Sequence, residues 1–235
     1  MRKLQAILLV VALLVPRLAV AADSGPYLVL DTGVHEAAIN ALARLADGGI
    51  VTVSDDKTAR IWRADGSDAL GALYPPIGPR DDGALYAVAA SAKVIAVAGR
   101  IPTAPGGYGI AFYSTQDFRS LGLFSGLPSA VLAMKMSPAG DRLAVGLDGG
   151  GLRVFDLKSL NIALQDTDFP GKITALDFDP SGRLAVAADD NKIELYDSAL
   201  HRLPPMMMHA GARAYGIAFS PDGSRLAAGD RESVV

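Results

Sequence analysis

The sequence predicts an all-β protein made of repeated four-stranded sheets, and three observations lead to this fold class. Apolar runs of about 5–7 residues alternate with turns rich in Gly, Pro, Asp and Asn, which is the pattern of strands and hairpins. The same pattern returns at a nearly constant interval along the chain. Half of the residues are apolar, a fifth are charged and the net charge is −3, which is typical of a globular protein with a core.

The N-terminus has the features of a secretory signal peptide. Arg2 and Lys3 precede the apolar run Leu4–Val15, and Ala19-Val20-Ala21 follows as a small-residue cleavage pattern. The run is too short for a bilayer-spanning helix, which needs about 20 residues. We therefore expect residues 1–21 to be removed, which leaves no membrane span and a periplasmic or secreted bacterial protein. The alternative is an uncleaved membrane anchor.

The rest of the chain is repetitive. The turn glycines Gly140, Gly182 and Gly223 follow one another at intervals of 42 and 41 residues. The aromatic residues that end the third strand of successive units show the same spacing, since Phe155 and Tyr196 are 41 residues apart. A period of about 40–45 residues is that of a four-stranded β-propeller blade.

Each unit contains strands and turns and no room for a helix. In the third unit, runs at 130–136, 142–146 and 152–156 are separated by turns. Small residues crowd the second strand of the units, as in Ala185-Val186-Ala187-Ala188, and suit a strand packed on both faces. The predicted organisation is a segment at 22–34, followed by units at 35–82, 83–127, 128–170 and 171–210 and a partial unit at 211–235.

Two segments carry a family resemblance. Ser220-Pro221-Asp222-Gly223-Ser224-Arg225-Leu226-Ala227-Ala228-Gly229 resembles the first hairpin of a WD40 repeat, and the segment from Ser54 to Trp62 resembles its second. The resemblance covers roughly residues 27–235. It implies a WD40-type β-propeller, here an incomplete ring of four full blades and part of a fifth.

The WD40 resemblance also implies a set of fastening residues. In that family a His, a Ser or Thr, an Asp and a Trp form a hydrogen-bonded chain within a blade, and in the first unit these are His35, Ser54, Asp56 and Trp62. A buried indole N–H and a buried carboxylate both need partners. For His35 the alternative role is that of a general base or metal ligand. The other units depart from the pattern, since Phe155 and two tyrosines replace the indole.

Counting the units predicts that the chain is the N-terminal part of a longer protein. The resemblance implies that the segment from Tyr27 to Thr32 is the outer strand that closes the ring, and its partner strands are not in the sequence. Propellers close with about 4–8 blades. A last unit that stops in mid-strand would leave an open sheet edge.

The composition favours no reaction chemistry. There is no basic stripe for nucleic acid and no cysteine for disulfides, thiolate ligands or nucleophilic catalysis. Met206-Met207-Met208-His209 could suit Cu(I), but successive strand residues alternate faces, so an apolar edge or a partner contact is the preferred interpretation. We therefore expect neither a metal nor another cofactor.

A lengthened loop in the second unit is the candidate partner-binding segment. Its residues are Arg100, Ile101, Pro102, Thr103 and Pro105. Insertions in propellers map to loops on one face, and that face is often the binding face. The alternative is a solvated excursion without a function.

The favoured function is a non-enzymatic, exported scaffold that binds other proteins, because the WD40 resemblance implies recruitment. The alternative is the sensor half of a larger bacterial protein with an effector domain, such as a caspase-like peptidase. A third possibility, an enzyme with a ligand in the channel, is disfavoured because Ala41, Ala87, Ala175 and Gly216 on the inner strands are small and apolar.

Overall fold

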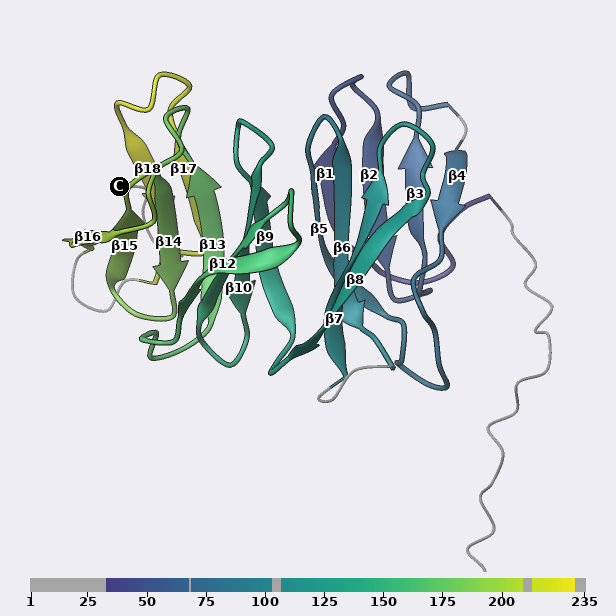
Figure 1. Ribbon diagram of the computed structural model, residues 1–235, viewed down its shortest axis with the longest axis horizontal. Helices are drawn as coiled ribbons and strands as arrows, with labels where there is room; N and C mark the ends of the chain where they lie inside the picture. The colour runs from purple at the N-terminus through teal and green to yellow at the C-terminus, as the bar shows by residue number, and fades with distance from the viewer. Residues whose placement is uncertain (1–32, 68, 103–106, 209–212, 231–235) are drawn as a thin grey trace, which may run out of the picture. The chain divides into compact units, whose positions relative to one another are not determined.

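A computed structural model describes residues 33–67, 69–102, 107–208 and 213–230, and these residues form strands and turns with no helix among them (Figure 1). None of the described segments could therefore cross a membrane as a helix. The predicted signal peptide 1–21 and the segment from Tyr27 to Thr32 lie outside the described residues.

The strands are β1 (Ile39–Arg44), β2 (Ile50–Ser54), β3 (Ala59–Trp62), β4 (Ala69–Leu73), β5 (Leu85–Ala90), β6 (Val94–Arg100), β7 (Tyr108–Ser114), β8 (Ser120–Leu127), β9 (Val131–Met136), β10 (Arg142–Leu147), β11 (Leu152–Asp156), β12 (Asn161–Asp166), β13 (Ile173–Phe178), β14 (Leu184–Ala188), β15 (Lys192–Tyr196), β16 (Arg202–Met207), β17 (Gly216–Phe219) and β18 (Leu226–Gly229).

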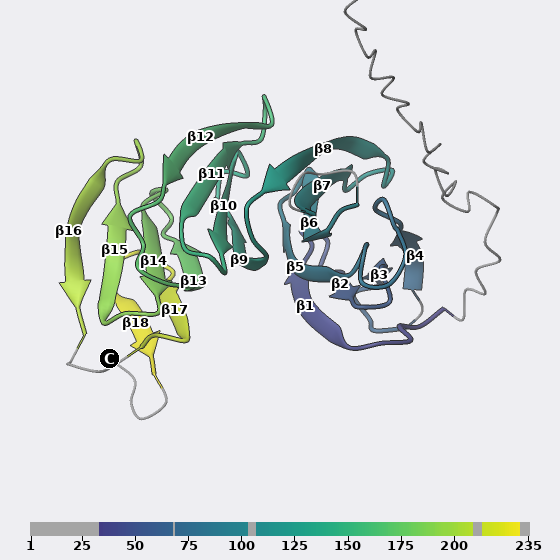
Figure 2. The same cartoon turned by 90° about the horizontal axis from the view of Figure 1, so that it is seen from below.

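The strands form successive antiparallel sheets in chain order. β1–β4, β5–β8, β9–β12 and β13–β16 each make a four-stranded meander, and β17–β18 make a two-stranded sheet. We call these sheets blades 1 to 5. The innermost strands β1, β5, β9, β13 and β17 contact one another in sequence, and the outer strands β8, β12 and β16 run along one border (Figure 2). The ring formed by the described blades is incomplete and does not close.

A β-bulge recurs near the start of the innermost strand of every four-stranded blade. The extra residues are Asn40, Tyr86, Leu132 and Thr174. A bulge bends the strand and re-aims a side chain. The Asn40 amide donates to the Leu85 carbonyl of blade 2 at 2.8 Å, and the Thr174 hydroxyl donates to the Ala214 carbonyl beside blade 5 at 2.5 Å. At two interfaces, therefore, the bulge fastens one blade to the next.

Small and branched residues fill the space between the blades. In β14 every residue is buried, with Leu184 and Val186 packed towards blade 3 and Ala185 and Ala187 towards blade 5. The strand is thus covered on both faces, as the run of alanines predicts. A Cβ atom at Gly146 of blade 3 would clash with the Ile173 side chain of blade 4, so close approach requires glycine there.

The turns between the third and fourth strands share an unusual backbone conformation. Phe118, Leu160 and Leu200 have φ of 57°, 55° and 69°, in the left-handed region that large apolar residues rarely adopt. Gly66 takes this position in blade 1 with φ of 72°. Each of the three apolar side chains packs against a cluster of buried residues between blades. Packing therefore holds the backbone in a conformation that costs about 1–2 kcal/mol.

Candidate functional site

A chain of hydrogen bonds ties the strands of blade 1 together. The His35 ring lies 2.7 Å from Asp56 through Nδ1 and 2.7 Å from the Thr52 hydroxyl through Nε2. The Trp62 indole N–H donates to the same hydroxyl at 2.7 Å. The chain links the residues before β1 to the turn after β2 and to the end of β3.

The hydroxyl in this chain belongs to Thr52 and not to Ser54, which corrects the set expected from the resemblance. Trp62 pairs with Ile50 in the β2–β3 ladder, so Thr52 is two residues from the indole's partner and Ser54 is four. The indole therefore reaches the nearer hydroxyl on the same strand face. Ser54 is buried at the end of β2, where its hydroxyl accepts the Asp56 N–H at 3.1 Å and stabilises the turn.

The carboxylate of Asp56 is held in its charged form. Burial alone would raise its pKa, but hydrogen bonds from Thr58 and His35 and from the backbone N–H groups of Thr58 and Glu36 lower the pKa below 3.8. The His35 side chain is only 3% exposed and both of its ring nitrogens are engaged. A buried imidazole whose two nitrogens both have hydrogen-bond partners is suited to holding the blade together and not to exchanging a proton with a ligand.

The candidate partner loop is anchored at its base. Arg100 ends β6, and Ile101 is 1% exposed with its N–H donating to the Gly107 carbonyl at 2.7 Å. Pro102 lies against Gly78 of the preceding loop. Thr103 and Pro105 lie outside the described residues. The structure thus places Ile101 in the core and removes it from any exposed contact surface.

The base of the lengthened loop joins the long connection 74–84 that leads from blade 1 to blade 2. The Arg100 N–H donates to the Ala84 carbonyl at 2.9 Å, and the Gly83 N–H donates to the Arg100 carbonyl at 2.7 Å. The Arg100 guanidinium also lies 3.3 Å from the Asp82 carboxylate. The connection 74–84 and the base of the lengthened loop therefore lie side by side at the surface of blade 2.

This surface presents aromatic, aliphatic and cationic side chains together. Ile77 is 48% exposed, and the Arg100 guanidinium lies 5.9 Å from the centre of the Tyr108 ring. Tyr86 is the bulge residue of β5, and its pKa is raised by partial burial and by the neighbouring Tyr108. We call Ile77, Tyr86, Arg100 and Tyr108 the blade 2 platform. Sequence reasoning found only Arg100, because the bulge that brings Tyr86 to this end of the blade depends on strand register.

A lysine–aspartate pair that the sequence pattern did not predict lies on the inner strands. Lys135 of β9 and Asp177 of β13 occupy equivalent positions in successive blades, where blades 2 and 5 have Ala89 and Ala218. Their side chains are 2.9 Å apart, and the Asp177 carboxylate also accepts the Phe219 N–H of blade 5 at 2.6 Å. These contacts tie three blades together beside a hollow of about 600 Å³. The inner strands are therefore less uniformly apolar than the sequence indicated.

The methionine run lies at the end of an outer strand. Met206 and Met207 are 47% and 62% exposed, whereas Met208 is buried. His209 lies outside the described residues. Within 33–67, 69–102, 107–208 and 213–230, no group of three His, Cys, Asp or Glu side chains is placed to hold a metal ion.

A comparison of the sequence with protein-family models finds a known repeat in two regions of the chain. The family model described as "WD domain, G-beta repeat" matches residues 28–63 and 164–197. The second match runs from the end of β12 through β15, so a sequence repeat begins in the outer strand of one blade and continues into the next.

A solved structure shares the fold. A chain of the "Crystal Structure of Mitotic Checkpoint Complex" aligns with a TM-score of 0.70 and 16% sequence identity over 82% of this chain. The chain described here carries WD40 repeats in the two matched regions and shares the fold of a solved WD40 propeller. The alignment spans 59% of the length of the matched chain, and at this identity it shows the fold alone. Curated protein sequences give no match.

Proposed function

We propose that this WD40 protein is an exported, non-enzymatic scaffold that binds another protein through the blade 2 platform. WD40 repeats suggest a protein-interaction role, and the platform adds a place on this molecule where such an interaction has suitable chemistry. Tyrosine and arginine are over-represented among the residues that dominate binding energy at protein interfaces.

The single observation that carries the proposal is the joining of the connection 74–84 to residues 100–102 and 107–108 around Arg100. Backbone hydrogen bonds fix the main chain at Arg100, and the ion pair with Asp82 and the contact with the Tyr108 ring orient the guanidinium before any partner arrives. A restrained side chain loses less conformational entropy on binding. The exposed Ile77 supplies an apolar neighbour that a partner can bury.

Capture with the full-length tagged protein tests the site. Wild type and the double variant Arg100→Ala/Tyr108→Ala are compared in the extracellular or periplasmic fraction of producing cells, with bound proteins identified by mass spectrometry. Arg119→Ala is the matched control, since Arg119 also pairs with an aspartate, Asp117, at 3.0 Å but lies in a turn at the opposite end of blade 2.

The proposal expects the double variant to lose a protein that wild type and Arg119→Ala both retain, with unchanged circular dichroism. Retention of every bound protein by the double variant would refute the site. Export is tested separately by N-terminal sequencing of the isolated protein. A start near Ala22 supports it, and an intact Met1 in the cytoplasmic fraction argues against it.

A further inference from the structure

The outer strand of each four-stranded blade is a sheet edge. Among the described residues, β4, β8, β12 and β16 are each paired on one side only. An edge strand offers unpaired backbone N–H and C=O groups that can pair with another chain, and proteins normally block such edges with charges, prolines, bulges or short strands. The four outer strands of this molecule differ in how well they are blocked.

Three of the outer strands carry recognisable protection. β16 contains Pro204 and Pro205, which cannot donate to a ladder, and begins with Arg202. β12 ends in a charged residue, Asp166. β4 is only five residues long.

β8 has none of these protections along most of its length. It is eight residues long, the longest strand in the described part of the chain, and its sequence Ser-Leu-Gly-Leu-Phe-Ser-Gly-Leu contains neither a charge nor a proline. Two bulges interrupt its pairing with β7, but Gly122 to Ser125 pair without interruption with Gly109 to Phe112. A regular edge therefore remains in the middle of the strand.

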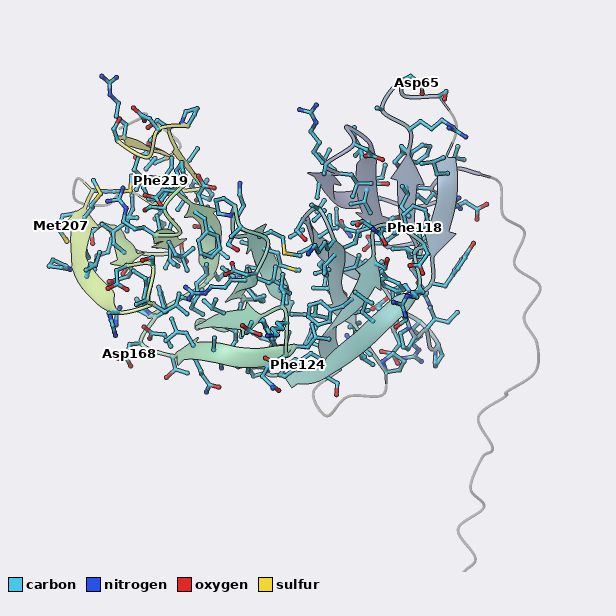
Figure 3. The ribbon with its side chains drawn as sticks, turned by 45° about the horizontal axis from the view of Figure 1, so that its top comes forward. Asp65, Phe118, Phe124, Asp168, Met207 and Phe219 are labelled. Atoms are coloured by element: carbon cyan, nitrogen blue, oxygen red, sulfur yellow. The ribbon has the colours of Figure 1, made fainter. Side chains whose placement is uncertain are left out.

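Phe124 anchors β8 to the neighbouring blade, whereas two leucines of the strand are exposed. The Phe124 ring packs edge-to-face on Phe155 of blade 3 with centroids 4.8 Å apart, and its position is seen in Figure 3. Leu121 and Leu123 are 38% and 42% exposed. The edge is thus a pre-ordered strand with exposed leucines, which lowers the entropic cost of adding another strand.

We propose that β8 is a self-association edge, at which the β8 strands of two copies of this chain pair antiparallel across a two-fold axis. The strand is electrically neutral, so a copy of itself meets no like-charge repulsion, whereas the same pairing would bring two prolines together in β16. Antiparallel pairing around Leu123 sets this residue opposite its own copy, so that each Leu123 has an apolar cross-strand partner, while Leu121 lies opposite Ser125.

The neighbouring charges are compatible with this arrangement. Arg119, directly before β8, is 72% exposed and paired with Asp117. In the antiparallel arrangement the start of one β8 lies beside the end of the other, where Leu127 and Pro128 are uncharged. The two arginines are therefore kept apart. Tyr108 of the blade 2 platform pairs with Leu127 at the end of β8, but the proposed pairing is centred four residues away on Leu123 and does not depend on the platform binding a partner.

Sedimentation equilibrium of the full-length protein over a range of concentrations tests the pairing. Wild type is expected to form a dimer, and Leu123→Lys is expected to weaken it by more than about tenfold because two like charges would face each other. Ala163→Lys, which adds the same charge to an exposed position of β12, is expected to leave the dimer unchanged. Leu42→Lys, at a 66% exposed position of the innermost strand β1, is expected to do the same.

Two measurements keep the test valid if Leu123→Lys fails to fold. A synthetic peptide of residues 120–127 should dissociate the wild-type dimer, whereas the same peptide with proline at positions 123 and 125 should not. Because the chain has no cysteine, Leu123→Cys should give a disulfide-linked dimer on mild oxidation, and Leu42→Cys should not. A monomer at every concentration, a dimer that persists in Leu123→Lys, or loss of the dimer in Leu42→Lys would overturn the proposal.

Discussion

Replacing Thr52 by valine tests the hydrogen-bonded chain of blade 1. Valine keeps the β-branched shape of threonine and removes only the hydroxyl, which the Trp62 indole N–H and the His35 ring both reach at 2.7 Å. Thr52 is 8% exposed and the His35 side chain is 3% exposed, so water cannot readily replace the lost contacts. Two ring nitrogens are then left without their partner.

The expected loss follows from the cost of unsatisfied buried polar groups. Each such group costs about 1–3 kcal/mol, and Trp62 is only partly buried, so we expect Thr52→Val to lower the free energy of unfolding by about 2–4 kcal/mol. For a chain of this size that corresponds to a fall in Tm of about 4–16 °C. Urea unfolding of the full-length protein, followed by Trp62 fluorescence, measures the change in the blade that contains the substitution.

Ser54→Ala is the matched control in the same strand. It removes one hydrogen bond, from the Asp56 N–H at 3.1 Å, and should cost only about 0.5–1.5 kcal/mol. If Ser54→Ala costs more than Thr52→Val, or if Thr52→Val leaves stability unchanged, the hydroxyl assignment and the reasoning from register are both wrong.

Three further predictions concern stability. Burial opposes the ionisation of Asp56 and Asp179, but their hydrogen bonds outweigh it and hold both pKa values below 3.8 in the folded protein. The stabilisation from these carboxylates is therefore complete above that pH and is lost as the pH falls through the lower pKa values of the folded state. The urea concentration at the midpoint of unfolding should be lower at acidic than at neutral pH, and equal midpoints would contradict this. Leu160→Ala keeps the left-handed backbone strain that Leu160→Gly relieves, so calorimetry should find the alanine variant less stable than the glycine variant by about 1 kcal/mol, and the reverse order would exclude strain at this turn. Gly146→Ala should destabilise by about 1–3 kcal/mol because the added methyl group meets Ile173, whereas Gly71→Ala, where nothing lies within 4 Å, should be close to neutral; equal effects would refute the packing argument.

Much of the fold could be predicted because turn residues and alternating strand patterns recur at a regular interval along the sequence. The spacing of Gly140, Gly182 and Gly223 predicts the hairpins, and the alanines of β14 predict a strand covered on both faces. These features depend on residues close together in the sequence. Local patterns therefore suffice for blade order and for the number of strands in each blade.

The contacts that depend on register could not be predicted in the same way. The choice between Thr52 and Ser54 is set by which residue of β2 faces Trp62 across the ladder, and linear spacing does not contain that information. The blade 2 platform could not be predicted for the same reason, because the position of Tyr86 depends on a bulge in the β5–β6 register. Lys135 and Asp177 meet because successive inner strands are aligned, although the residues lie 42 positions apart.

Hydrogen–deuterium exchange of the full-length protein, alone and with a captured partner, tests the proposed scaffold function most directly. The platform predicts that peptides covering 74–84 and 100–108 exchange more slowly in the complex, while the turns at 137–142 and 179–183 at the opposite end of the blades remain unchanged. Protection confined to those opposite turns, with none at 74–84 or 100–108, would contradict the account.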